Sequence, residues 1–104
     1  MPDELHSLVD IDRLVHEPAR LVILTILNVV EKADFLYLLR ETGLTRGNLS
    51  SHLSKLEEAG YIEIEKTYKG RVPQTLVSIT EQGRAAFLTY RQKLNELVQR
   101  INKE

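Results

Sequence analysis

The stretch that decides the fold is residues 44–87, LTRGNLSSHLSKLEEAGYIEIEKTYKGRVPQTLVSITEQGRAAF. Its first part predicts a helix over residues 45–59, with Thr45 as its N-cap and Gly60 as its stop. The leucines of this helix share one face, which predicts its core side: Leu49, Leu53 and Leu56. From residue 61 polar and apolar side chains alternate, and residues 75–79 predict a returning strand, so a hairpin follows the helix.

Toward the amino terminus, Pro18 suits the first turn of a helix over residues 19–30, where its missing N–H costs nothing. That segment is apolar nearly all round, so we expect it to be buried on more than one side. A second subunit is one candidate for the surface that buries the other side of this helix. A short helix over residues 10–16, after an N-terminal arm, is expected to precede it.

A further helix is expected over residues 35–42, directly before the stretch quoted above. Asp34 suits its N-cap, and Gly43 suits the left-handed residue that ends it. Residues 43–45 then join two helices by a three-residue connection, which is typical of a helix-turn-helix.

Thr80 is expected to cap a last helix over residues 81–102. Apolar residues recur along it in the alternating three- and four-residue steps of a heptad seam: Phe87, Tyr90, Leu94, Leu97 and Ile101. The seam predicts a homodimer, whereas packing onto residues 19–30 of the same chain is the alternative. A mixed arrangement is favoured, with Phe87 near the body and residues 94–101 against a second subunit. The predicted dimer-interface residues are Leu21, Leu24, Tyr90, Leu94, Leu97, Val98 and Ile101.

This order of elements predicts the α+β class and a winged helix-turn-helix fold, in which a three-helix core carries a two-stranded wing and a long C-terminal helix. A chain of 104 residues can bury one core. We therefore expect a single domain over residues 1–104. Its expected parts are an arm over residues 1–13, a helix-turn-helix over 34–59, a wing over 61–79 and a dimerisation helix over 81–102.

The exposed face of the helix over residues 45–59 is small, polar and free of acid in its first three turns. Small side chains let a helix approach base edges in a major groove, and Ser or Asn can exchange hydrogen bonds with bases or phosphates. The residues predicted to contact DNA from this helix are Thr45, Arg46, Asn48, Ser50, Ser51, His52, Ser54 and Lys55. A solvated helix face is the alternative, and for His52 the alternative is a half-packed histidine.

The hairpin carries Lys66, Lys69 and Arg71 with no acid between them. This cluster predicts a wing that reaches a neighbouring minor groove or a run of phosphates, with Arg71 at the tip. Charge that only keeps a hairpin tip solvated is the alternative.

Composition limits the other classes of function. The formal net charge is −1, so positive charge for DNA must be local, and the absence of cysteine excludes disulfides and thiolate metal sites. The three histidines lack metal-ligand spacing, and no phosphate loop or nucleophile elbow is present. We expect no metal, no cofactor and no enzyme activity. The acidic start and the short apolar runs predict a cytoplasmic protein without a membrane segment.

Over residues 14–90 the chain resembles the winged helix core of MarR- and ArsR-type transcriptional regulators, especially their short stand-alone archaeal forms. The matching residues are Leu49, Ser51, His52, Leu53, Leu56, Glu57, Gly60, Tyr61, Pro73, Thr75, Thr80, Gly83 and Arg84. The resemblance implies an operator-binding homodimer with Ser50, Ser51 and Lys55 toward the groove and Arg71 in the wing. The chain departs from the pattern in lacking thiolates for metal sensing and an extra domain for an effector pocket. A small-molecule effector is therefore allowed but not indicated.

The predicted function is sequence-specific binding of double-stranded DNA by a homodimeric transcriptional regulator. The recognition helix is expected in the major groove and the wing on the adjacent minor groove or backbone. The alternative is a winged helix that serves as a protein–protein interaction module and never touches DNA, because fold does not fix function.

Overall fold

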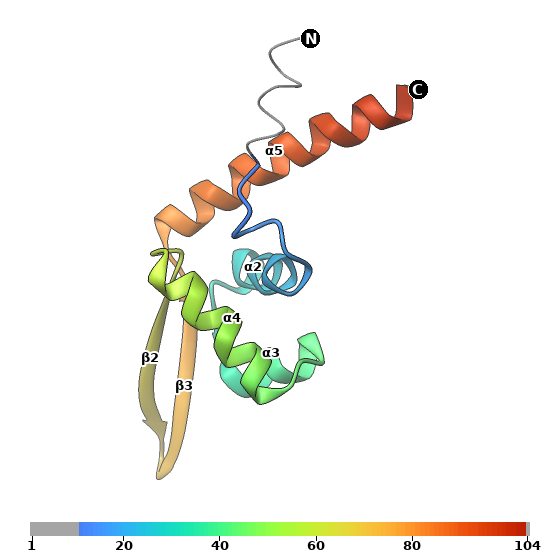
Figure 1. Cartoon of the computed structure of the whole chain (residues 1–104). Helices are drawn as coiled ribbons and strands as arrows, with labels where there is room; N and C mark the ends of the chain where they lie inside the picture. The colour runs from blue at the N-terminus through green and yellow to red at the C-terminus, as the bar shows by residue number, and fades with distance from the viewer. Residues whose placement is uncertain (1–10, 104) are drawn as a thin grey trace.

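The computed structural model describes residues 11–103 of the chain. Its first helix, α2 (Pro18–Val30), begins at the proline, and the Glu17 carboxylate caps it by accepting the N–H groups of Ala19 and Arg20. Figure 1 shows α2 between the pair α3 (Phe35–Thr42) and α4 (Arg46–Glu58) and the long C-terminal helix.

Only one face of α2 is buried. Ile23 and Leu24 are fully buried, whereas Val22 and Val29 on the other side are 46% and 78% exposed. The expectation of burial on more than one side is thus not met within the described chain. Leu24 was predicted at the dimer interface, and this is wrong for the present conformation, because its side chain is already covered by its own core.

Residues 11–17 form turns, so the helix expected over residues 10–16 is not found over the part that is described. The Asp12 side chain offers the backbone an alternative to helical hydrogen bonds, because its Oδ1 accepts the N–H groups of Leu14 at 2.9 Å and Val15 at 3.3 Å. The first ten residues of the predicted N-terminal arm lie outside the described residues.

The helix-turn-helix consists of α3 (Phe35–Thr42) and α4 (Arg46–Glu58). Each predicted signal acts as expected: the Asp34 side chain caps α3, Gly43 ends it with a φ of 69°, and Thr45 Oγ1 accepts the Asn48 N–H. The three core leucines of α4 are buried. These local contacts confirm the predicted α3–α4 unit.

The sheet has three antiparallel strands in the order β1-β3-β2: β1 (Lys32–Asp34), β2 (Ile62–Lys69) and β3 (Val72–Ile79). The sequence patterns missed β1, because a three-residue strand is too short to show a period of two. The wing strands are also longer than expected, since the ladder continues to the pair Lys69–Val72. Gly70 and Arg71 alone form the loop, and the positive φ of 66° at Gly70 alone is that of a type II′ turn. Arg71 is at the tip, as predicted.

The last helix, α5 (Glu81–Lys103), starts where Thr80 Oγ1 accepts the Gly83 N–H at 2.9 Å. Phe87 and Tyr90 fill the core, and the rest of the helix projects from the body (Figure 1). Tyr90 was predicted to meet a second subunit, which is wrong, because it is 2% exposed and its hydroxyl lies 2.8 Å from His16 Nδ1.

The core lies where α2, α3 and α4 meet the inner face of the sheet and the start of α5. Its residues are Val15, Ile23, Leu24, Leu27, Ala33, Leu38, Leu49, Leu53, Leu56, Ile62, Val77, Phe87 and Tyr90. Within residues 11–103 no helix is long and apolar enough to cross a membrane.

Candidate DNA-binding surface

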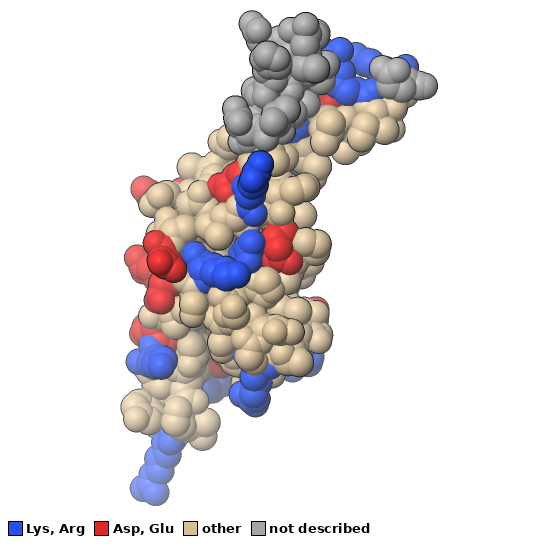
Figure 2. Space-filling model, in the orientation of Figure 1, with Lys and Arg blue, Asp and Glu red and all other residues tan. Residues whose placement is uncertain are grey.

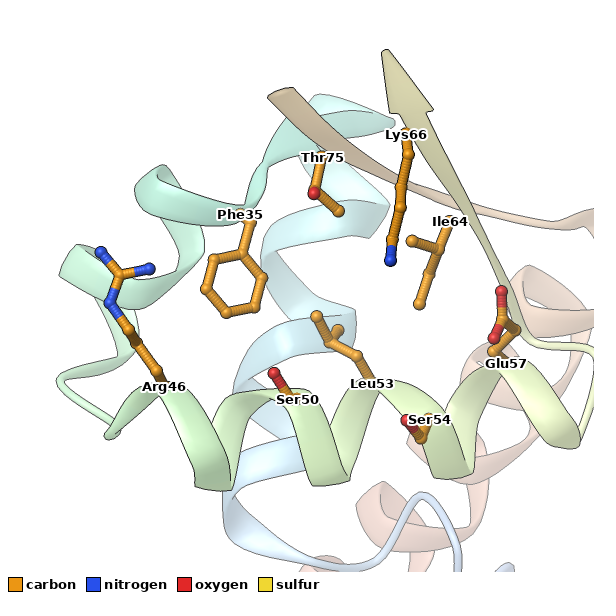
Figure 3. Close-up of a pocket in the computed structure, with 9 residues that line it drawn as sticks. All are labelled: Phe35, Arg46, Ser50, Leu53, Ser54, Glu57, Ile64, Lys66 and Thr75. Carbon is orange, nitrogen blue, oxygen red and sulfur yellow. The ribbon is translucent and has the colours of Figure 1, made fainter. Parts of the chain in front are cut away.

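A cavity of about 730 Å³ lies between α4 and the wing (Figure 3). It is lined by Phe35, Arg46, Ser50, Leu53, Ser54, Glu57, Ile64, Lys66 and Thr75. Of the residues predicted to bind DNA, the fold therefore brings four together here from two separate elements: Arg46, Ser50, Ser54 and Lys66.

The cavity has an apolar floor and a charged rim. Phe35, Leu53 and Ile64 form the floor in Figure 3, while Arg46 rises from one end of α4 and the Lys66 amine points from β2 toward α4. None of the ion pairs found between described residues involves either cation. Two cations without ion-pair partners on opposite walls of one groove suit a polyanion between them.

The other α4 residues lie outside this cavity. Asn48, Ser51 and Lys55 are exposed along the helix, and the Thr45 hydroxyl is used in capping. Gly47 has open space where a Cβ would stand. The exposed side of α4 is thus accessible over its whole length, and its backbone is bare near the N-terminal end.

His52 faces the body instead. Its Nδ1 lies 3.1 Å from Arg20 Nη1 and 3.4 Å from Glu17 Oε2, and its side chain is 20% exposed. The buried Arg20 also donates from Nε to the Leu14 carbonyl. This placement favours the half-packed alternative for His52, in which it links α4 to α2 and to the turn before α2, and its contact with DNA stays a prediction.

Glu17 supplies the negative charge in this cluster. Partial burial would raise the pKa of its carboxyl, but two backbone N–H donors and the nearby His52 and Arg20 lower that pKa below its ordinary value. The carboxylate consequently remains ionised and balances the buried Arg20 charge.

Charge is distributed unevenly along the molecule, although the net charge is only −1. In Figure 2 basic side chains occupy the tip of the wing and the end of the α3–α4 pair nearest it, and others lie over the middle of this face and near the C-terminal end of α5, while acidic side chains gather over the C-terminal end of α4. Glu57 and Glu58 are exposed at that end. The basic side chains therefore form several separate groups, of which two lie at the wing and at the start of α4.

Lys69 is not equivalent to Lys66. Hydrogen bonds from the Gln74 side chain and the Leu36 N–H, with the charge of Lys69 contributing, lower the pKa of Asp34. Lys69 and Asp34 share one face of the sheet, opposite to that of Lys66, although none of the ion pairs found among residues 11–103 joins them. Between residues 11 and 103 no cluster of His, Cys, Asp or Glu could hold a metal ion.

Apart from Glu57, four residues of the cavity were not predicted as functional residues from the sequence: Phe35, Leu53, Ile64 and Thr75. Their types are those of ordinary core or strand residues, and only the tertiary fold, in which β2 packs against α4 and α3 packs against β3, brings them to one groove. Glu57 was recognised as an acid of the last turn, but its place on the cavity wall depends on the same packing.

A helix-turn-helix followed by a long hairpin and a cationic groove between them defines a winged helix-turn-helix protein. The chain belongs to the family of winged helix DNA-binding domains, whose model matches residues 19–98.

Two relatives match nearly their whole length. An uncharacterized protein of Methanocaldococcus jannaschii is 40% identical over 90 residues, which cover 86% of this chain and 97% of that protein. A solved structure of a transcriptional regulator homologue from Pyrococcus horikoshii OT3 is 29% identical, with a TM-score of 0.86, and the match covers 96% of this chain and 98% of that one.

The fold also occurs in a MarR family regulator from Silicibacter pomeroyi, with a TM-score of 0.65 and 21% identity over 86% of this chain and 59% of that one. The expected resemblance to winged helix regulators is confirmed by these matches.

Proposed function

We propose that this protein is a transcriptional regulator that binds double-stranded DNA sequence-specifically as a homodimer. The observation that carries the proposal is the cavity between α4 and the wing, with Arg46 and Lys66 on its opposite walls. Either cation alone is an ordinary surface charge. Together, on two elements that a winged helix directs at neighbouring grooves, they suit a DNA backbone.

In this arrangement α4 occupies the major groove. Its exposed Ser51 and Lys55 and the open space at Gly47 leave room for close approach to base edges. The wing then reaches the adjacent minor groove or its phosphates with Arg71 at the tip. The name of the Pyrococcus horikoshii relative supports a regulatory role.

The dimer rests on the second half of α5. Leu97, Val98 and Ile101 are exposed along a helix that projects from the body, and Leu94 is half-buried at the start of this stretch. An apolar stripe on a projecting helix is stabilised by the same stripe of a second copy about a twofold axis. Two modules then read two half-sites, which multiplies the affinity of one. Leu21, half-buried on α2, borders such an interface in this proposal.

The test is a fluorescence anisotropy titration of labelled random duplex DNA at several salt concentrations. We expect binding in low salt that falls steeply as salt rises, because phosphate contacts release counterions. Arg46→Ala and Lys66→Ala should each weaken binding, whereas Lys103→Ala, which removes the same charge at the far end of α5, should not. A chain that binds no duplex even in low salt refutes the proposal and favours a protein-interaction module.

A further inference from the structure

Two large apolar side chains stand exposed on the wing, outside the cavity. Tyr68 is 69% exposed and Val72 is 66% exposed. Neither side chain belongs to the core or to the residues packed against it, and neither carries a charge. An exposed tyrosine at the end of a cationic hairpin can offer a partner both an apolar ring and a polar hydroxyl.

The strand register places these two side chains on opposite faces of the wing. Tyr68 pairs with Pro73 and Lys66 pairs with Thr75, whereas Val72 pairs with Lys69. Because side chains alternate along a strand, Tyr68 shares the face of Lys66 and Thr75, both of which line the cavity. Val72 and Lys69 share the other face.

The cavity face of the wing therefore continues past Lys66 to Tyr68, about 7 Å further along the strand. If α4 lies in a major groove and the wing in the next minor groove, one phosphodiester strand must cross the space between them. That space is the cavity. With about 3.4 Å of axial rise per nucleotide, Lys66 and Tyr68 lie one or two nucleotides apart along that strand.

We infer that Tyr68 is a DNA-contacting residue that forms the outer wall of this passage. Its ring packs on the deoxyribose of the crossing strand, and its hydroxyl donates a hydrogen bond to a phosphate oxygen. This inference rests on the proposed function and adds to it a contact that depends on neither charge nor base identity. It also explains why an aromatic residue is kept exposed on this face of the wing.

The test compares three variants of the full chain, with folding checked by circular dichroism and binding measured on the same labelled random duplex at several salt concentrations. Tyr68→Ala should weaken binding roughly fivefold to tenfold, because it loses the apolar contact and the hydroxyl. Tyr68→Phe should lose about twofold to threefold, because it loses the hydroxyl alone. Val72→Ala is the matched control: it truncates an equally exposed side chain on the other face and should stay within about twofold of the wild type.

The salt dependence of binding distinguishes the loss of a contact made by Tyr68 from a change in the shape of the wing. Tyr68→Ala removes no charge, so the slope of log affinity against log salt should remain that of the wild type. A lower slope means that Lys66 or Arg71 has moved, and it overturns the inference, as does an equal loss in Tyr68→Ala and Val72→Ala. A wild type that binds while Tyr68→Ala binds equally well overturns only this inference. A wild type that binds no duplex overturns the proposed function together with it.

Discussion

The wing and the second half of α5 both extend from the body, but they differ in how their exposed side chains are arranged (Figure 1). The wing presents Lys69 and Arg71 at its end, whereas α5 presents a stripe of apolar residues that includes Leu97 and Ile101. The charged end of the wing is well hydrated and attracts a polyanion. Exposed apolar side chains on α5 are unfavourable in water until another apolar surface covers them. This contrast fits the two proposed partners, DNA for the wing and a second copy of the chain for α5.

The two extensions meet at a joint made largely of backbone. The Thr80 N–H donates to the Tyr61 carbonyl at 3.0 Å, and the Thr80 hydroxyl donates to the Gly60 carbonyl at 2.6 Å. Gly83 of α5 lies directly against the same Tyr61 carbonyl. Because backbone groups cannot move aside as flexible side chains do, we expect this joint to hold the angle between the wing and α5. In a dimer, that angle sets the distance between the two wings.

The largest expected effect comes from breaking the joint with Gly83→Ala. An ideal Cβ at this position would lie 2.1 Å from the Tyr61 carbonyl oxygen, so α5 must shift against β2. We expect a loss of about 3 kcal/mol in the free energy of unfolding, as for overpacking of a tight core site. Urea denaturation followed by circular dichroism measures it.

Gly47→Ala is the matched control for that substitution. Gly47 lies in α4 with nothing within 4 Å of an added Cβ, so alanine there should stabilise the fold by about 0.5 to 1 kcal/mol. Equal stability of Gly83→Ala and the wild type would show that the joint yields, and the rigid link between the two extensions would have to be abandoned.

The second largest effect is expected from charges placed in the apolar stripe of α5, which the wing does not share. Leu97→Glu/Ile101→Glu places two charges in the apolar stripe, at positions that are exposed in the single chain and so are not needed for its fold. We expect sedimentation to show a monomer with unchanged circular dichroism. Affinity for a duplex carrying two half-sites should fall by about a hundredfold, because the second module no longer binds from an effective concentration.

The control adds the same two charges on the opposite face of α5. Gln92 and Gln99 are exposed there, so Gln92→Glu/Gln99→Glu should remain dimeric. A dimer that survives Leu97→Glu/Ile101→Glu would place the interface elsewhere, with the exposed valines of α2 as the next surface to test.

Most of the fold could be predicted from the sequence, because its signals are local. Asp34, Thr45 and Thr80 each cap the helix that follows, and Gly43 ends α3, by contacts within a few residues. The buried leucines of α4 follow from a helical period. Caps and periods need no knowledge of the rest of the chain.

What could not be predicted depends on which surfaces meet. A heptad spacing shows that one face of α5 is apolar, but it does not say whether its own core or a second copy covers each residue. Tyr90 is covered by the core while Ile101 is left exposed, although both belong to one seam. The surroundings of His52 could not be predicted for the same reason, since its helix position alone does not reveal Arg20 and Glu17 behind it.

Lys66 and Lys69 allow a test of whether the two faces of the wing differ in DNA binding. Lys66 and Lys69 carry equal charge three residues apart, but Lys66 faces the cavity and Lys69 lies on the other face near the ionised Asp34. We expect Lys66→Ala to weaken duplex binding about threefold to tenfold and to lower the salt slope by about one. Lys69→Ala should cost less than about twofold. Equal losses in the anisotropy titration would show that only the net charge of the wing matters and that its two faces do not differ.

The smallest expected effect tests the acidic end of the cavity. Glu57 lines the cavity with Arg46 and Lys66, whereas Glu58 is the next residue of α4 and does not. If a phosphodiester strand passes through the cavity, the Glu57 carboxylate repels it across solvent, where such interactions are weak. Glu57→Gln should therefore strengthen duplex binding by about twofold, while Glu58→Gln, with the same change in net charge, should leave it nearly unchanged. Equal gains in both variants would mean that the duplex senses only the overall charge of this end of α4. A gain confined to Glu57→Gln would instead indicate that the DNA backbone passes between α4 and the wing. Sedimentation should be unchanged in both variants, because the apolar stripe on α5 is not altered.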